Sequence, residues 1–286
     1  MLGPVAMLAV PAAAHAAKPD RNLYVSLGDS YAAGYQPTAP GVGRTTRNGF
    51  AYQLPGLAKP RGYKLKLVNF ACGGETTVSL LERKRECGKG LGPGGVKYGG
   101  TTQLKAAAKY IRAHKQKIAL ITVSISGNDV TACARAADPV PCVQAATTSI
   151  NANVTKIAKA LRKAAGSKPK LVGITYPDVI LGAWVANPPN QDLARLSVVA
   201  FQSIINPALK KAYAAGKGRF VDVTAATGAY TPLEQLTDLP PYGQMPQAVA
   251  DACNLSYYCE FGDIHARTSG YKAIAELIAK TLPKRS

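Results

Sequence analysis

A short apolar segment that stops at a Gly-Asp-Ser turn constrains the fold of this chain more than any other feature. Leu23 to Leu27 reads Leu-Tyr-Val-Ser-Leu, which is typical of a buried strand. The chain then breaks at Gly28-Asp29-Ser30 and resumes with small residues that favour a helix. A serine at such a turn can present its hydroxyl above the carboxyl edge of an open α/β sheet, where these folds bind ligands. On this tripeptide alone, a helix N-cap explains Ser30 equally well.

Four further apolar segments continue this alternation of strands and helices. We expect strands over Lys64 to Phe70, Lys117 to Ser126, Leu171 to Thr175 and Phe220 to Val223. We expect helices over Gly49 to Ala58, Thr102 to His114, Cys142 to Ala165, Gln191 to Ala215 and Thr268 to Leu282. Pro207 should kink or break the fourth of these helices. The alternation predicts one α/β domain with a central parallel five-stranded sheet that is covered by helices on both faces.

Two segments rich in glycine or proline are predicted to be irregular loops. They are Pro37 to Asn48 and Thr231 to Gly262. Long loops are usually functional or tied down. We therefore expect these two to shape the selectivity of any site at the sheet edge.

The N-terminal segment is typical of an export signal. Met1 to Ala17 carries no charged side chain and contains Ala14-His15-Ala16, which fits a cleavage site before Ala17. Pro4 and Pro11 interrupt an apolar run that is too short to span a membrane. We predict a signal peptide over residues 1–16, a single domain over residues 17–286, and a secreted protein.

The six cysteines agree with export. They fall into three local pairs, Cys72 with Cys87, Cys133 with Cys142 and Cys253 with Cys259. Sequence alone does not choose among the connectivities, and neighbour pairing is the simplest, because each bridge would tie one loop. Zinc is the alternative, but the chain has no Cys-x-x-Cys pair and only 3 histidines. We therefore predict disulfides and no metal site.

The net charge of +19 is unevenly distributed, with 28 basic against 9 acidic residues through Gly216 and 7 against 7 after it. Such an excess attracts anionic lipid head groups, acidic polymers or nucleic acid. Lys105, Lys109 and Arg112, however, occupy the polar face of a predicted helix, as on an ordinary solvated surface. Basic and aromatic residues are not interleaved as in single-strand binders. We predict no nucleic-acid partner and retain an anionic membrane or cell-wall surface as an alternative to the purely solvated face.

Polar residues follow the first three predicted strands, and parallel strands bring these ends to one sheet edge. Ser30 follows the first strand, Gly74 the second and Asn128 the third, while His265, preceded by Asp263, comes just before the last helix. Acyl transfer needs a hydroxyl activated by an imidazole whose other nitrogen is oriented by an acceptor. It also needs donors that face the developing oxyanion. The N–H groups of Ser30 and Gly74 and the Asn128 amide are natural donors.

Four blocks along the chain resemble the GDSL, or SGNH, hydrolase family, and more narrowly its secreted actinobacterial lipase and esterase members with three disulfides. The blocks are Gly28-Asp29-Ser30-Tyr31, Asn69-x-Ala71-x-x-Gly74-x-Thr76, Ser126-Gly127-Asn128-Asp129 and Asp263-Ile264-His265. Tyr31 replaces the Leu of the family name, Ser126 replaces a Gly, and the last block is one residue shorter than Asp-x-x-His. Each block is weak by itself, but together, in family order over nearly the whole mature chain, they are specific.

The resemblance implies a flavodoxin-like, three-layer α/β/α sandwich and ester hydrolysis without a metal or other cofactor. It implies Ser30 as the nucleophile, Gly74 and Asn128 as oxyanion donors beside the Ser30 N–H, and His265 as general base and then acid. Elimination supports His265, since His15 would leave with the signal peptide and His114 lies among basic residues at a predicted helix end.

The shortened last block leaves the third member of the triad open. Gly262 stands where the family usually has Asp, so Asp263 reaches the imidazole only if the loop bulges. Otherwise a backbone carbonyl orients His265. We hypothesise Asp263. Asp29 and Asp129 are interpreted as structural residues that accept hydrogen bonds from local backbone N–H groups.

These patterns together predict a secreted serine esterase or lipase, acting as a monomer on a small-molecule or lipid ester through an acyl-enzyme. An acyltransferase, or a phospholipase A acting on anionic lipid, is the enzymatic alternative. A non-catalytic binding protein of the same fold is the contrasting class, because a fold alone does not establish a function.

Overall fold

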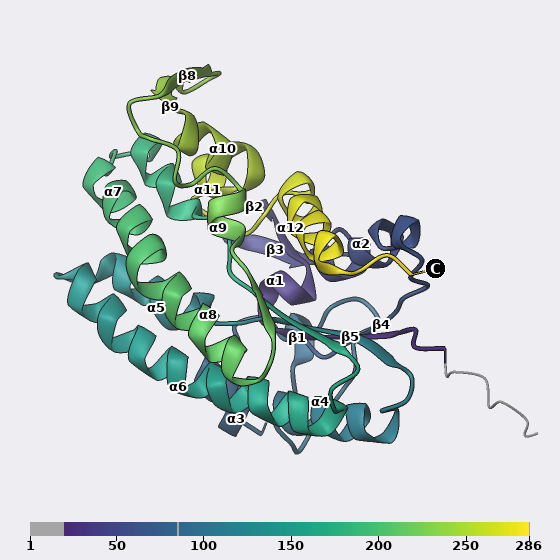
Figure 1. Ribbon diagram of the computed structural model, residues 1–286. Coiled ribbons are helices and arrows are strands. Elements are labelled where there is room, and N and C mark those ends of the chain that lie inside the picture. Colours follow the sequence, from purple (N-terminus) through teal and green to yellow (C-terminus); the bar gives the residue numbers. More distant parts are fainter. Residues whose placement is uncertain (1–19, 85, 286) are drawn as a thin grey trace, which may run out of the picture.

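Five parallel strands form the centre of the protein in a computed structural model that describes residues 20–84 and 86–285 (Figure 1). The strands are β1 (Leu23–Gly28), β4 (Lys66–Asn69), β5 (Ile118–Ser124), β6 (Lys170–Ile174) and β7 (Arg219–Val221). Their order across the sheet is β4-β1-β5-β6-β7. This is the flavodoxin-like order, in which the ligand crevice lies beside the first strand. The predicted five-stranded parallel sheet is confirmed, with strand ends displaced by a residue or two. The predicted signal peptide over residues 1–16 lies outside the described residues.

Helices cover both faces of this sheet because successive strand residues point to opposite sides. Val25 and Leu27 pack under α4 (Gln103–Ala113), α6 (Pro139–Ala165) and α8 (Asn206–Ala215). Tyr24 points to the other face, which is covered by α2 (Phe50–Leu57) and α12 (Thr268–Thr281). The three-layer α/β/α sandwich is therefore confirmed. The shorter helices of the connections are α3 (Thr77–Glu82), α9 (Val223–Ala226), η1 (Lys59–Arg61) and η2 (Gly88–Gly90).

Two faces predicted from helical periodicity are present. Tyr271, Ile274 and Ile278 of α12 are fully buried against the sheet. The basic side chains of α4 are exposed on the opposite side of that helix from its apolar residues. Burying an aliphatic or aromatic side chain contributes roughly 1.5 to 3 kcal/mol. The apolar face of α12 therefore fixes the helix that directly follows His265.

The prediction of an irregular loop over Pro37 to Asn48 is wrong for its first part. An antiparallel hairpin forms there from β2 (Tyr35–Ala39) and β3 (Val42–Thr45). Its turn contains Gly41, whose φ of +71° lies in the left-handed region that glycine tolerates. The Gln36 amide donates to the carbonyl of Ala266 and to the hydroxyl of Thr268, so the hairpin is tied to the segment that carries His265.

The prediction that Thr231 to Gly262 is irregular is also wrong. The segment contains β8 (Leu236–Leu239), β9 (Gly243–Pro246), α10 (Gln247–Leu255) and α11 (Tyr258–Phe261). Met245 and Val249 pack into a small core of their own with Leu181. Pro232 precedes β8, Pro240 and Pro241 lie in the hairpin turn, and Pro246 ends β9 just before α10, so no proline interrupts the interior of a strand or helix.

The long helix predicted over Gln191 to Ala215 is interrupted near Pro207, as expected. It divides into α7 (Gln191–Val199), a π-helical segment η5 (Ala200–Ile205) and α8. Pro207 lies in the first turn of α8, where its missing N–H would have no intrahelical partner. The wide π-helical turn faces the sheet edge and contributes to the cavity described below.

Three disulfides tie segments that leave the carboxyl edge of the sheet or lead to His265. They join Cys72 to Cys87, Cys133 to Cys142 and Cys253 to Cys259. The predicted neighbour pairing is therefore confirmed. Among the helices of the described residues, none combines the length and apolar character needed to cross a bilayer.

Candidate active site

Ser30 lies where β1 turns into the one-turn helix α1 (Ser30–Ala33). Gly28 makes the turn possible, because its φ is +137° and an added Cβ would lie 1.9 Å from the carbonyl oxygen of Ser124. The N-cap of α1 is Asp29, whose carboxylate accepts from the N–H of Tyr31 at 3.0 Å. Ser30 is thus not the N-cap of this helix, and its hydroxyl is available at the sheet edge.

Asp29 has the structural contacts that the sequence predicted. It is 2% exposed, and its second carboxylate oxygen accepts from the Tyr176 hydroxyl at 2.6 Å. Burial raises the pKa of Asp29 to about 7, against the hydrogen bonds from Tyr176 and from the N–H of Tyr31, which favour the charged form. These bonds hold the backbone that carries Ser30.

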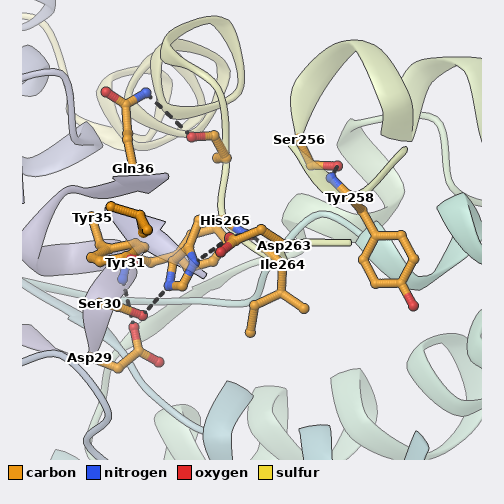
Figure 2. Close-up of polar contacts among 12 residues, drawn as sticks. Asp29, Ser30, Tyr31, Tyr35, Gln36, Ser256, Tyr258, Asp263, Ile264 and His265 are labelled. Atoms are coloured by element: carbon orange, nitrogen blue, oxygen red, sulfur yellow. Dashed lines mark hydrogen bonds and ion pairs between the residues drawn. The ribbon is translucent and has the colours of Figure 1, made fainter. Parts of the chain in front are cut away.

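His265 connects Ser30 to Asp263 (Figure 2). Its Nε2 lies 2.7 Å from the Ser30 Oγ, although the two residues are 235 positions apart in sequence. Its Nδ1 lies 2.6 Å from the Asp263 Oδ1. A carboxylate only accepts, so Nδ1 carries the hydrogen of the neutral ring and Nε2 is free to take a proton from Ser30.

Asp263 reaches the imidazole through a tight turn. Its Oδ1 also accepts from the backbone N–H of His265 at 2.9 Å, so the carboxylate bonds the backbone two residues ahead as in an Asx turn. Gly262 supplies the left-handed residue before it, with a φ of +65°. Burial disfavours the charged carboxylate, but its hydrogen bonds and charge interaction with His265 prevail and hold the pKa of Asp263 below its ordinary value. Of the two arrangements left open by the sequence, the side-chain contact is the one present.

Asn128 and Gly74 lie in the segments that follow the two strands that flank β1, β5 and β4. Asn128 lies in α5 (Gly127–Val130), and its Nδ2 donates to the carbonyl of Glu75 at 2.8 Å. An amide nitrogen carries two hydrogens, so one remains for a ligand. Gly74 has a φ of +75°, and an added Cβ would meet no atom within 4 Å. The second and third sequence blocks are therefore joined at the sheet edge, and Asn128 lines the same cavity as Ser30.

Asp129 has a structural partner that is not local. Its carboxylate accepts from the backbone N–H of Thr77 at 3.0 Å and from the Thr77 hydroxyl at 2.6 Å, 52 positions away. The expectation of a nearby backbone partner is corrected, because the carboxylate fixes the start of α3 instead. Among the described residues, no three or more His, Cys, Asp or Glu side chains are grouped so as to hold a metal ion.

An apolar cavity of about 110 Å³ opens beside Ser30. It extends between the segments that follow β5 and β6, including η3 (Thr131–Arg135), η4 (Val179–Val185), α7 and η5. Its wall includes Val130, Val143, Ile180, Leu193, Ala200 and Phe201. Concave apolar surfaces with a few polar groups at one end are typical of sites for apolar ligands.

The sequence prediction missed the tyrosines that surround the imidazole. The ring of Tyr35 lies 4.4 Å from that of His265, and the ring of Tyr31 lies 5.8 Å from it (Figure 2). The position of Tyr31 directly after Ser30 was a signal for this role. Tyr35 gave no signal, because the hairpin that places it was not predicted.

A family model described as the GDSL-like Lipase/Acylhydrolase family matches residues 26–273, which include all four blocks. No curated protein matches the sequence. The match covers the five strands apart from the start of β1 and includes Ser30, Asp263 and His265.

Several solved structures share the fold at low sequence identity. A lipase from a goat rumen metagenome has a TM-score of 0.55 at 16% identity, covering 91% of this chain and 96% of its own. Phospholipase A1 from Streptomyces albidoflavus has a TM-score of 0.52 at 14% identity, covering 91% and 98%. An extracellular lipase from Streptomyces rimosus has a TM-score of 0.50 at 17% identity, covering 91% and 100%. At these identities the likeness shows the fold alone.

Proposed function

Because this chain belongs to the GDSL-like lipase/acylhydrolase family, we propose that it is a secreted serine hydrolase that cleaves carboxylic esters through an acyl-enzyme on Ser30. One observation carries the proposal. The Ser30 hydroxyl, the His265 imidazole and the Asp263 carboxylate form an unbroken chain of contacts at 2.7 and 2.6 Å. That arrangement fits acyl transfer, in which a base activates a hydroxyl and an acceptor orients the base.

In the first half-reaction, the Ser30 Oγ attacks the ester carbonyl carbon while its proton passes to the His265 Nε2. The Asp263 carboxylate stabilises the imidazolium that forms. The N–H groups of Ser30 and Gly74 and the Asn128 amide donate to the oxyanion of the tetrahedral intermediate. The carbon–oxygen bond to the alcohol then breaks, and Nε2 returns the proton to the departing oxygen.

In the second half-reaction, water attacks the acyl group on Ser30 and loses a proton to the His265 Nε2. The second tetrahedral intermediate collapses with cleavage of the bond to Ser30. The proton then returns from Nε2 to the Ser30 Oγ, and a carboxylic acid leaves. The same residues therefore serve both steps.

The apolar cavity favours an acyl chain as the part of the substrate that it holds. Its wall is predominantly apolar, and it opens directly beside Ser30. Secretion is favoured by the three disulfides, which persist in oxidising compartments. The net charge of +19 favours work at an anionic membrane or cell-wall surface.

Hydrolysis of chromogenic acyl esters by the wild type and Ser30→Ala tests the reaction. Losing the nucleophile of a Ser/His site costs on the order of 10⁶ in kcat. A collapse of that order supports the acyl-enzyme. Equal, feeble rates in both proteins would favour the binding-protein reading instead. Adding an alcohol acceptor to the assay separates hydrolysis from acyl transfer.

A series of esters of increasing chain length tests the cavity. Ala200→Phe adds a ring to the cavity wall and should lower kcat/KM for long chains by about tenfold or more, with a smaller effect on short chains. Val199→Phe is the matched control, because Val199 is the residue next to Ala200 but its side chain is 54% exposed and does not line the cavity. If kcat/KM depends on chain length in the same way in both variants, the acyl chain does not bind in this cavity.

A further inference from the structure

Two departures from the family pattern lie in contact with each other. One is Tyr31, which replaces a leucine directly after the nucleophile, and the other is the shortened block Asp263-Ile264-His265. The Tyr31 hydroxyl donates to the carbonyl oxygen of Ile264 at 2.5 Å, across 233 positions of sequence. Ile264 is the single residue between Asp263 and His265. The hydroxyl that distinguishes Tyr31 from a leucine therefore forms its hydrogen bond with the segment that is one residue shorter than the family pattern.

The contact fixes one particular peptide unit. The carbonyl of Ile264 and the N–H of His265 belong to the same planar peptide group and point in opposite directions. Tyr31 donates to the carbonyl, while the Asp263 carboxylate accepts from the N–H at 2.9 Å. The peptide is thus held from both sides. Rotating it would break the turn through which Asp263 reaches the imidazole.

The other contacts of this loop lie outside that peptide. The carbonyl of His265 accepts from the N–H of Tyr257 at 3.0 Å, and Ser256 forms a bridge with Ala266. These bonds fix the chain after the imidazole. They leave the orientation of the peptide before it to Tyr31 and Asp263.

Tyr31 is rigid enough to act as such a holder. It is 4% exposed, and its ring packs edge-on against Tyr176 and Tyr271, at 4.9 and 5.5 Å between ring centres. Burial raises the pKa of its phenol, which keeps the hydroxyl a donor. Its backbone follows Ser30 directly, so one residue links the nucleophile to the loop that carries the base.

We propose that Tyr31 is a positioning residue that compensates for the shortened last block. Its hydroxyl holds the Ile264 carbonyl so that the turn at Asp263 presents the His265 Nε2 to Ser30. A leucine at this position would leave the carbonyl without this donor. The inference rests on the proposed function and names a residue that this reaction needs, although it does not touch the reacting atoms.

Tyr31→Phe tests the proposal, because it keeps the ring and removes only the hydroxyl. Small displacements of catalytic groups cost up to about 10²-fold, so kcat should fall roughly 10- to 100-fold while KM stays within about twofold. Tyr213→Phe is the matched control. It removes another buried tyrosine hydroxyl, which donates to the carbonyl oxygen of Val123 over 3.4 Å and does not contact the site. We expect kcat to stay unchanged in this variant.

A double-mutant cycle with Asp263→Asn shows whether Tyr31 acts through the Asp263–His265 contact. Coupled residues give non-additive effects, so Tyr31→Phe should cost less than about threefold in the Asp263→Asn background. An unchanged kcat for Tyr31→Phe in the wild-type background overturns the proposal. So does the same fold loss in both backgrounds, since Tyr31 would then act elsewhere.

A proton NMR measurement separates failure of this inference from failure of the proposed function. If the wild type hydrolyses no ester, the function fails, but the proton on the His265 Nδ1 still reports the contact to Asp263. We expect a far-downfield signal that is absent in His265→Gln, broadened or shifted upfield in Tyr31→Phe, and retained in Tyr213→Phe. A signal that Tyr31→Phe leaves unchanged overturns the inference whatever the activity.

Discussion

Ser30 and His265 face each other across the candidate site, but the chain holds them by different means. Ser30 comes directly off β1, and the pairing of Gly28 with Ser124 of β5 fixes its height at the sheet edge. His265 follows no strand. It is placed by contacts with Tyr31 and the β2–β3 hairpin, which are distant in sequence, and with the nearby Tyr257. We call the residues that follow the strands, Ser30, Gly74 and Asn128, the strand-borne half of the site, and Asp263 and His265 the loop-borne half. The sheet positions the strand-borne half, whereas the loop-borne half depends on tertiary contacts.

This difference extends to the surroundings of each half. Behind Ser30, Asp29 and Tyr176 form a buried hydrogen-bonded pair. Around His265, Tyr31 is buried, but other contacts lie nearer to solvent, for example the ion pair between Arg267 and Glu260 at 2.7 Å. Exposed pairs of this kind contribute roughly 0 to 1 kcal/mol. The loop-borne half should therefore be the easier one to perturb without unfolding the protein.

The largest effect within the loop-borne half is expected from Asp263→Asn. The amide no longer enforces the correct imidazole tautomer or stabilises the imidazolium, so kcat should fall about 10³- to 10⁴-fold. Steady-state hydrolysis of a short-chain ester measures it. Glu260→Gln, a neutralisation nearby in the sequence, should change kcat less than about twofold. Near-normal kcat in Asp263→Asn would remove Asp263 from the triad.

A smaller effect is expected from Asn128→Ala in the strand-borne half. Losing one oxyanion donor costs about 10²- to 10³-fold in kcat with little change in KM. Asn153→Ala is the control, since its amide donates to the Thr77 hydroxyl at 3.1 Å and does not line the cavity. If the two variants retain equal kcat, Asn128 only joins α5 to Glu75.

The smallest effect concerns stability and involves Asp178, which follows β6. Asp178 is 1% exposed, and burial raises its pKa to about 7 against hydrogen bonds from Ser197 and the N–H of Ile180. The Ser197 hydroxyl lies 2.8 Å from both Asp178 and the carbonyl of Ala194. A hydroxyl has one hydrogen, which the ionised Asp178 must share with the carbonyl of Ala194, whereas a protonated Asp178 can donate to the Ser197 oxygen and leave that hydrogen to Ala194.

The sign of the pH dependence follows from this raised pKa. Between about pH 4 and 7 the folded state binds more protons than the unfolded state, so the free energy of unfolding falls as pH rises through that window. Asp178→Asn mimics the protonated acid and should flatten the fall, which makes the variant more stable than the wild type at pH 8 by roughly 1 to 4 kcal/mol. Urea titrations across pH measure it. Burial also raises the pKa of Asp29 to about 7, so the free energy of unfolding of the variant should still depend on pH, but less steeply than that of the wild type. A slope as steep as that of the wild type would contradict this account.

The sequence predicted the strand-borne half well because its residues follow apolar runs whose ends are visible in the sequence. Ser30, Gly74 and Asn128 could be placed at one edge without any knowledge of side-chain contacts. The surroundings of His265 could not be predicted in the same way. The bond from Tyr31 joins residues that no local pattern relates. Asp263 stands in the last sequence block, but the shortened spacing left open whether its side chain reaches the imidazole.

The missed secondary structure has a similar cause. The β2–β3 hairpin and helix α10 lie in segments whose glycine and proline residues indicated loops but lie mainly at turns and at the ends of strands and helices. Tertiary contacts decide these segments, through Gln36 on one side and the small core around Met245 on the other. The cavity beside Ser30 depends on the π-helical turn at Ala200, which no periodicity in the sequence indicated.

The most direct test of the central claim is to treat the wild type with a chromogenic alkyl phosphonate ester and locate the adduct by mass spectrometry. This reagent traps a nucleophile activated by an adjacent base. We expect a single adduct on the peptide that carries Ser30, and none in Ser30→Ala or His265→Ala. An adduct on another residue, or ester hydrolysis that continues with Ser30 unlabelled, would contradict the account.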